Sequence, residues 1–281
     1  MSRTRYTTVL LALLLLPACE VSRRATEASP DSRVEVLSGD QVNWTPLNPA
    51  RGDASPQAAT LWGNRGESVK TGFLVKFRDG FSSPPHTHNV SYRGVVISGE
   101  VHNAHPDSEK MYMPAGSFWT QPAGHVHITA AKGANNVAYI EIDDGPYLVL
   151  PTEQAFDNGE RPINVDATNV VWVDAPESGD SGAKLAYLWK KPGTNGVSGY
   201  LLQLPSRFSG RIVCDGEAFR AVVVGGELEH RSSNDSTTNL LGPGSYFSST
   251  GRMVHRVECS TGESCTLYLR VAGDFELENA R

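Results

Sequence analysis

A repeated sequence pattern constrains the fold of this chain more than any other feature. Segment 81–101, FSSPPHTHNVSYRGVVISGEV, and segment 208–228, FSGRIVCDGEAFRAVVVGGEL, align without a gap at an offset of 127 residues. Because a constant spacing over separate stretches marks a structural repeat, we expect two copies of one unit in tandem. Four further pairs share this spacing to within one residue: Leu61 with Leu188, Trp62 with Trp189, Gly72 with Gly199, and His127 with His255.

Each unit is expected to be a small β-barrel. Hydrophobic runs such as 92–97 and 218–224 are rich in valine and end at residues that favour turns. The 27 glycines and 17 prolines fit a chain with many turns, and no stretch has helical periodicity over three turns. We therefore predict an all-β fold of two tandem barrels, at 41–157 and 168–277.

The N-terminal segment has the features of a lipoprotein signal peptide, expected at residues 1–18. Two arginines precede the aliphatic run Val9–Leu16, which is far shorter than the roughly 20 residues that cross a bilayer. The tetrad Leu-Pro-Ala-Cys, which ends at Cys19, resembles the lipobox of bacterial lipoproteins and implies lipidation of Cys19. Glutamate rather than aspartate, Glu20, follows this cysteine, and in this respect the segment resembles lipoproteins that are sorted to the outer membrane. We expect a lipid anchor in the cell envelope, at the outer membrane facing the periplasm, and a polar tether over 19–40.

Three cysteines lie beyond the anchor. Cys259 and Cys265 flank a short hairpin-like loop, and an oxidising envelope compartment permits a disulfide between them. Cys214 would then be the odd thiol, buried rather than reactive.

The first unit carries three histidines at a spacing that suits a metal. His86 and His88 are two residues apart, so on a strand both side chains point to the same side, which a barrel turns inward. His127 lies about 40 residues later and would supply a third ligand from a separate strand. Neutral imidazole suits several divalent ions, so these residues predict a metal site without naming the ion.

Two motifs surround the histidines of the first unit. They read Gly80-x5-His86-x-His88-x3-Tyr92-x6-Gly99 and Gly116-x5-Pro122-x-Gly124-x2-His127. These motifs resemble the two conserved motifs of the cupin superfamily. The resemblance implies that each unit is a double-stranded β-helix, or jelly roll, and that the chain is a bicupin. It also implies a divalent metal ion, such as iron, zinc, manganese or nickel, at His86, His88 and His127.

Tyr92 departs from the cupin pattern, which usually has a glutamate at this position. Tyr92 is the candidate catalytic residue, as a proton donor or orienting group, while direct metal ligation and plain packing stay open as alternatives. A phenol must lose a proton before it ligates a metal, which favours the donor role. Glu141, on a later strand, is weighed as a substitute carboxylate. His125 could reach the pocket, but a role at the surface or in support of a ligand is favoured.

The second unit is expected to be degenerate. The gapless alignment places Val213 and Asp215 at the positions of His86 and His88, and of the three histidines only His255 survives. One histidine and one aspartate hold a catalytic metal poorly, so any metal chemistry is predicted in the first unit.

Four short segments of the first unit support a narrower resemblance: Leu-Trp-Gly at 61–63, His-Thr-His at 86–88, Tyr-Arg-Gly-Val-Val-Ile at 92–97 and Gln-Pro-Ala-Gly at 121–124. They resemble the bacterial domain-of-unknown-function 4437 family. This resemblance covers most of the chain and implies a cupin fold without an assigned activity. A weaker likeness, to the cupin of anti-sigma factors of the ChrR type, implies a sensing role.

These features leave three functional hypotheses. The first is a metal-dependent oxygenase or isomerase that acts on a small molecule. The second is a non-catalytic ligand- or metal-binding or sensing protein, and the third is a scaffold with a structural metal. A net charge of −6 argues against nucleic acid as a partner. A site without a carboxylate ligand is expected to prefer an anionic small molecule, and a homodimer is left open.

Overall fold

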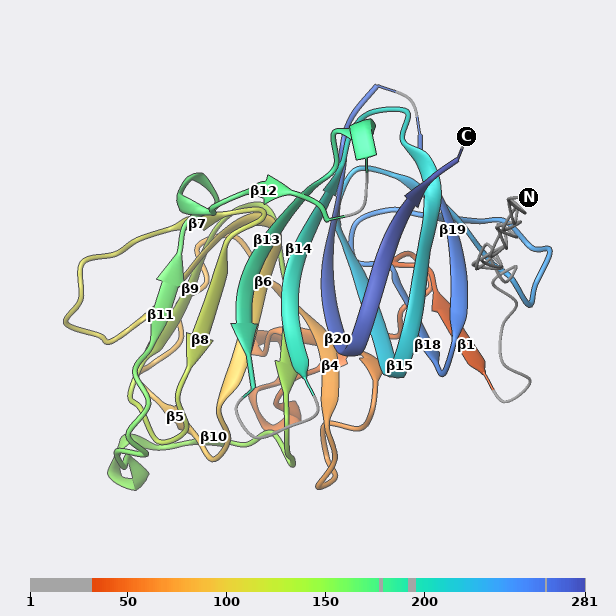
Figure 1. Cartoon of the computed structure of the whole chain (residues 1–281). Helices are drawn as coiled ribbons and strands as arrows, with labels where there is room; N and C mark the ends of the chain where they lie inside the picture. Colours follow the sequence, from red (N-terminus) through yellow and green to blue (C-terminus); the bar gives the residue numbers. More distant parts are fainter. Residues whose placement is uncertain (1–31, 177–178, 192–195, 261, 281) are drawn as a thin grey trace, which may run out of the picture.

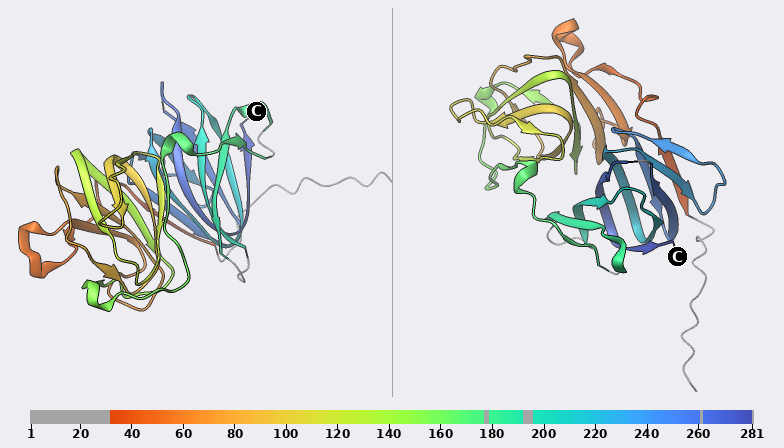
Figure 2. Two further views of the ribbon diagram at one scale, coloured as in Figure 1. Left: turned by 90° about the vertical axis from the view of Figure 1, so that its left-hand side faces the viewer. Right: turned by 90° about the horizontal axis from the view of Figure 1, so that it is seen from above.

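Strands and turns make up nearly all of the described part of the chain, residues 32–176, 179–191, 196–260 and 262–280 of the computed structural model. The expected all-β class of two jelly-roll barrels is confirmed, and the two barrels lie side by side (Figures 1 and 2). The expected signal peptide and Cys19 lie outside the described residues. The short 3-10 helices are η1 (Pro49–Ala54), η2 (Thr152–Gln154), η3 (Ala167–Asn169) and η4 (Gly179–Ser181).

The first barrel contains a sheet with the strand order β11-β8-β6-β9-β4-β3-β2, in which β7 pairs with β6. A separate short pair, β5 and β10, lies beside the metal motif. The long strands β6 and β9 pair along most of their length, with shifts of register around Ser98. The strands are β2 (Thr45–Pro46), β3 (Gln57–Trp62), β4 (Thr71–Phe77), β5 (Thr87–His88), β6 (Tyr92–Ala104), β7 (Met113–Pro114), β8 (Phe118–Gln121), β9 (Ile128–Ile142), β10 (Val149–Leu150) and β11 (Ile163–Val165).

The second barrel repeats this topology. Its path β13-β14-β20-β15 corresponds to β3-β4-β9-β6, and β18 pairs with β15 as β8 pairs with β6. The repeated sequence thus produces a repeated sheet. The strands are β1 (Arg33–Leu37), β12 (Val173–Asp174), β13 (Lys184–Lys190), β14 (Val197–Leu204), β15 (Ser209–Gly225), β16 (Leu228–Ser232), β17 (Asn239–Leu241), β18 (Tyr246–Thr250), β19 (Met253–Cys259) and β20 (Cys265–Asn279).

Two short strands are exchanged between the barrels. β1 precedes the first unit but pairs antiparallel with β18 of the second barrel, where it is visible in red beside the blue strands (Figure 1). β11 precedes the second unit but pairs with β8 of the first barrel in the equivalent register. Residues 33–37 were expected in the tether, and 163–165 in the linker between the units. Each instead covers an otherwise open sheet edge of the other barrel, which ties the two barrels together.

Hydrophobic side chains form three cores. One fills the first barrel around Phe73 and Trp119, and one fills the second barrel around Phe219 and Phe247. The third lies between the barrels and includes residues of both. Because this shared core buries large side chains from both units, the barrels form one packed structure.

Aromatic residues at the shared core follow the sequence repeat. Trp62 Nε1 donates to the Tyr139 hydroxyl at 3.1 Å, and Trp189 Nε1 donates to the Tyr268 hydroxyl at 3.0 Å. A Cβ at Gly72 would lie 2.1 Å from the Trp62 indole, so only glycine fits beside this ring. The same close approach occurs between Gly199 and Trp189, which explains why both pairs recur at one spacing.

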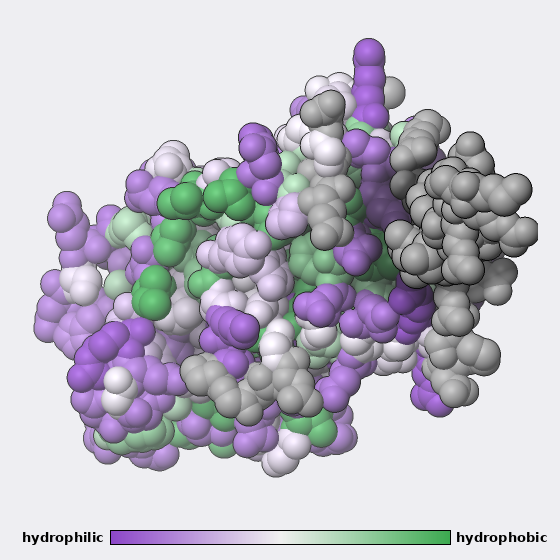
Figure 3. Space-filling model, in the orientation of Figure 1, coloured by the Kyte–Doolittle hydropathy of each residue, from purple (hydrophilic) through white to green (hydrophobic). Residues whose placement is uncertain are grey.

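The segment that joins the barrels runs over the surface. Figure 3 shows hydrophobic atoms along the stretch from β11 to β12, where Val171 and Val173 are 78% and 44% exposed. Within the described residues, no helix has the length and apolar character needed to cross a membrane.

Cys259 and Cys265 lie close together, Cys259 at the end of β19 and Cys265 at the start of β20. Both are free, buried thiols in this structure. A hydrogen bond between the two side chains lowers the pKa of Cys259 and raises that of Cys265. The disulfide stays a prediction. Cys214 is a free, buried thiol whose pKa is raised by burial.

Candidate metal centre

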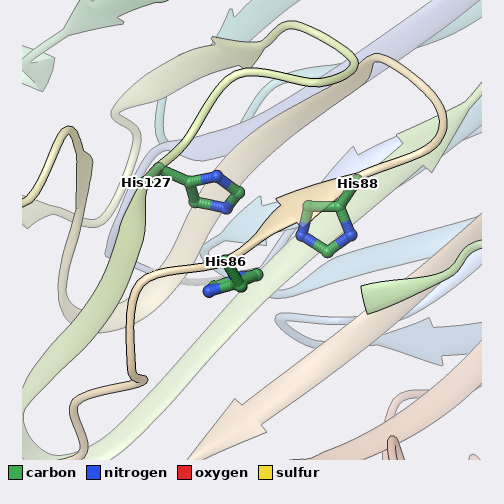
Figure 4. Close-up of side chains that lie close together, drawn as sticks. All are labelled: His86, His88 and His127. Atoms are coloured by element: carbon green, nitrogen blue, oxygen red, sulfur yellow. The ribbon is translucent and has the colours of Figure 1, made fainter. Parts of the chain in front are cut away.

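The three predicted histidines meet in the first barrel. His88 belongs to β5, His86 lies just before it, and His127 precedes β9. His86 pairs with His127 through the backbone, so the two chain segments run side by side. One nitrogen of each ring lies within 4.8 Å of the other two, and the rings face a common space (Figure 4).

Backbone carbonyls orient all three rings. The Nδ1 atoms lie 2.9, 2.8 and 3.1 Å from backbone carbonyl oxygens, in the order His86, His88 and His127. Because a carbonyl can only accept, each Nδ1 carries the proton, and each Nε2 keeps the lone pair that a metal would bind. A hydrogen bond from the second ring nitrogen to a carbonyl oxygen is typical of metal-binding histidines. The accepting carbonyls belong to Pro84, Leu148 and His125.

The rings are neutral near pH 7, as metal ligands must be. Burial lowers the pKa of His88 to about 3, with the neighbouring His86 as a further cause. Burial also lowers the pKa of His86 and His127. Three uncharged imidazoles in a buried site leave a divalent ion with its full charge, so the donor set fits such an ion and favours an additional anionic ligand.

Tyr92 faces this group from β6. Its hydroxyl donates to Asn103 Oδ1 at 2.9 Å and lies 3.3 Å from His127 Nε2. Asn103 is held in turn by Gln121, through a hydrogen bond of 2.9 Å, and by Thr129. Burial raises the pKa of Tyr92 well above 10, so the phenol is neutral. The hydroxyl is therefore placed as a donor at the edge of the site.

A second phenol, Tyr147, also reaches the site. It comes from the loop between β9 and β10, stacks on His88 at 4.5 Å, and places its hydroxyl 3.2 Å from His88 Nε2. Sequence reasoning missed Tyr147 because it lies in a loop outside both motifs. The loop is fixed in place by Asn89, whose side chain bonds to the backbone of Pro146 and Leu148.

Tyr92→Phe tests the role of the first phenol. We expect the variant to keep its metal, and to lose about 1 kcal/mol of stability with the hydrogen bond to Asn103. Asn103 Oδ1 still accepts from Thr129, so no buried acceptor is left bare. Metal content and urea unfolding give the two readouts. Loss of the metal would instead show that Tyr92 is a ligand.

The centre opens into a small cavity of about 90 Å³. This space has room for several water molecules or for a small organic ligand. Aromatic and aliphatic residues form most of its wall, and His86, His88, Tyr92 and Tyr147 line one side.

Glu141 does not supply a carboxylate to this site. It is fully buried between the barrels, where it accepts hydrogen bonds from Arg270 and Tyr268 at 2.9 Å each. The hypothesis of Glu141 as a substitute ligand is therefore wrong. His125 contributes through its backbone, because its carbonyl accepts from His127 Nδ1 and from Gln121.

The structure corrects the alignment of the second unit by one residue. His86 pairs with His127, but it is Ile212, not Val213, that pairs with His255. Cys214 thus takes the place of His88, and Asp215 is exposed and paired with Arg252. The first unit has one more residue before its histidines, at the Pro84-Pro85 step. The second unit has the matching extra residue later, at a bulge of β15 near Gly216, where the register is restored.

Within the described residues, the three-histidine group is the one cluster with metal-site spacing.

The second barrel keeps a buried pair of histidines instead. His230 Nε2 lies 2.9 Å from His255 Nδ1, and His255 Nε2 lies 2.9 Å from the Ser249 hydroxyl. His230 stands where the first barrel has Asn103. Burial lowers the pKa of His230 to about 4, and lowers that of His255 well below 6.5.

This pair predicts a loss of stability in acid. The folded state disfavours protonated His230, whereas the unfolded chain takes up the proton near pH 6.5, so stability falls as the pH drops from about 6.5 toward 4. Acidification from pH 7 to pH 4.5 lowers the unfolding free energy of the unmutated protein. In His230→Asn this loss should be smaller by about 2 to 3 kcal/mol. Urea unfolding of both proteins at both pH values measures this, and an unchanged pH dependence would contradict it.

Comparison with known proteins is consistent with this architecture. The model of a family described as a domain of unknown function, DUF4437, matches residues 35–278. This chain belongs to the DUF4437 family. The matched range includes both barrels and the three histidines, and begins within the exchanged strand β1. A search of the curated proteins found no match to this DUF4437 protein.

Solved structures similar to this DUF4437 protein share its cupin fold. A protein of Nostoc punctiforme, described as a proposed dioxygenase, is 13% identical with a TM-score of 0.65, and the match covers 89% of this chain and 87% of that one. A variant of salicylate 1,2-dioxygenase of Pseudoaminobacter salicylatoxidans, in complex with gentisate, is 11% identical with a TM-score of 0.56, and the match covers 89% of this chain and 87% of that one. A variant of oxalate decarboxylase from Bacillus subtilis is 12% identical with a TM-score of 0.55 and covers 91% and 80%. At these identities the likeness shows the fold alone.

Proposed function

We propose that this DUF4437 protein is a metal-dependent oxygenase that acts on a small organic molecule, with its metal held by His86, His88 and His127. One observation carries the proposal: one nitrogen of each of three neutral imidazoles lies within 4.8 Å of the other two, and two of these residues, His86 and His88, line a cavity. Three protein ligands leave positions open for substrate, which is typical of a catalytic rather than a structural site. Similar folds in described dioxygenases support the choice.

The cavity wall favours oxygenation over isomerisation. An isomerase needs a residue that removes a proton, with a pKa near the working pH. No aspartate, glutamate or lysine occurs among the described residues of the wall. Burial raises the pKa of both phenols, Tyr92 and Tyr147, which makes them donors rather than bases. A bound redox-active metal such as iron or manganese would supply Lewis acidity and electron transfer. The chain's own residues would orient the substrate, donate hydrogen bonds and exclude water.

The lack of a base also favours a second candidate, a binding or sensing protein. In that case the first barrel captures a metal or a ligand without turning it over. Oxygen consumption separates the candidates. Protein loaded with iron or manganese is expected to consume oxygen in the presence of a suitable small organic acid, and zinc-loaded protein is not. If the zinc-loaded protein converted the acid without consuming oxygen, this would favour an isomerase. Tight binding of the acid without turnover would favour the second candidate.

We further propose that Cys19 anchors the protein to the cell envelope, at the outer membrane facing the periplasm. The aliphatic run before Cys19 and the tetrad around it support this location. Cys19→Ser is expected to release the protein from the membrane fraction, while the barrels stay folded because Cys19 precedes the first strand. Fractionation and the mass of the N-terminal peptide give the readouts. An unmodified N-terminal peptide in the wild-type protein would contradict the anchor.

A further inference from the structure

The charge of the cavity wall is one-sided. Arg51 is the single permanently charged side chain among the described wall residues, and no carboxylate balances it there. Within the described residues, Arg51 also makes no ion pair elsewhere. An exposed guanidinium without a partner at the mouth of a cavity is a ready anion-binding group.

Local hydrogen bonds hold Arg51 at this mouth. Arg51 closes a turn, because its backbone N–H donates to the Asn48 carbonyl at 3.0 Å. The Asn48 side chain caps the same 3-10 helix, η1, by accepting from the N–H of Ala50 at 3.1 Å. Before it, Leu47 bonds to the Pro56 carbonyl at 2.8 Å and packs against the core of the first barrel. The backbone that carries the guanidinium is therefore fixed to the barrel.

Arg51 and the metal centre face the same space. Both Arg51 and His86 line the cavity. An anion between them would be attracted by Arg51 and by a metal bound at His86.

The remaining wall is apolar. The ring centroids of Phe77 and Phe81 lie 5.2 Å apart, and the two rings form an aromatic surface. Val75, Trp119 and Ile140 extend it into the barrel, and all of them are buried. This surface would bind the apolar body of a ligand through the hydrophobic effect.

We infer that the cavity binds a carboxylate with an apolar body of about one ring, with the acid group between the metal position and Arg51 and the body against the aromatic wall. The inference rests on the proposed metal centre, and it narrows the substrate class of that centre. Arg51 is the residue that would distinguish an acid from its neutral counterpart.

The test uses protein loaded with cobalt, whose visible absorption reports ligands near the metal. The protein is titrated with benzoate, acetate and neutral benzamide. Acetate lacks the apolar ring and benzamide lacks the acid group, so each comparison with benzoate tests one part of the ligand. We expect benzoate to bind at least ten times more tightly than either of the others. Because a hydrogen bond to a charged group contributes about 1.5 to 3 kcal/mol, Arg51→Ala should weaken benzoate binding roughly 10- to 100-fold. Arg256→Ala, an exposed arginine of the second barrel, is the control and should leave binding unchanged.

The outcomes separate this inference from the proposed metal centre. Normal cobalt binding with equal affinity for benzoate and benzamide, or with no effect of Arg51→Ala, would overturn the inference alone. Equal affinity for benzoate and acetate would overturn the role of the apolar wall. Absence of cobalt binding in the unmutated protein would overturn the metal centre and the inference with it.

Discussion

Replacing His127 by alanine is expected to lower the affinity of the protein for a divalent metal by at least two powers of ten, about 2.8 kcal/mol. The variant loses one of three converging Nε2 donors, and two imidazoles hold a divalent ion poorly. Competition with a coloured chelator measures the affinity, and elemental analysis measures the metal content of the purified protein.

The second barrel offers a matched control in His255→Ala. His255 is the repeat-related counterpart of His127, and both side chains are fully buried. Both substitutions therefore remove the same group from a packed interior and should lower stability to a similar extent. Only the first should release the metal. Equal metal content in the two variants would contradict the assignment of the centre to the first barrel.

Glu141→Ala is expected to destabilise the protein by about 3 to 5 kcal/mol. Glu141 is fully buried and Arg270 is 3% exposed, so the substitution leaves a guanidinium between the barrels with Asp143 as its remaining acidic partner. Removing one member of a buried ion pair has a cost of this size. The hydroxyls of Tyr139 and Tyr268 lose their acceptor as well.

Urea unfolding of Glu141→Ala beside Lys132→Ala measures this effect. Lys132 lies on the same strand, β9, but its ion pair with Glu100 is exposed to water. Its loss should therefore change the stability by under about 1 kcal/mol. A similarly small change for Glu141→Ala would show that the buried network contributes little to holding the barrels together.

The sequence was sufficient to predict the repeat and the grouping of the three histidines. The repeat shows as matching residues at a constant offset, and strand alternation places His86 and His88 on one side. The one-residue error in the second unit arose because a gapless alignment cannot detect an extra residue that is offset by a later bulge. That error is why Asp215, rather than Cys214, was compared with His88.

The features that were not predicted depend on contacts between distant segments. β1 and β11 are only five and three residues long, too short to give a periodic signal, and their partners lie in the other unit. Tyr147 reaches the centre from a loop whose position is fixed by Asn89, far away in the sequence. Glu141 was a candidate metal ligand because the sequence does not show which face of β9 contacts the other barrel.

An anomalous difference map from crystals of metal-loaded protein, with data collected at the absorption edge of the bound ion, tests whether the three histidines hold the metal. We expect one peak per chain, at about 2.0 to 2.2 Å from the Nε2 atoms of His86, His88 and His127. A principal peak in the second barrel, or no peak in the first barrel after loading, would contradict the account.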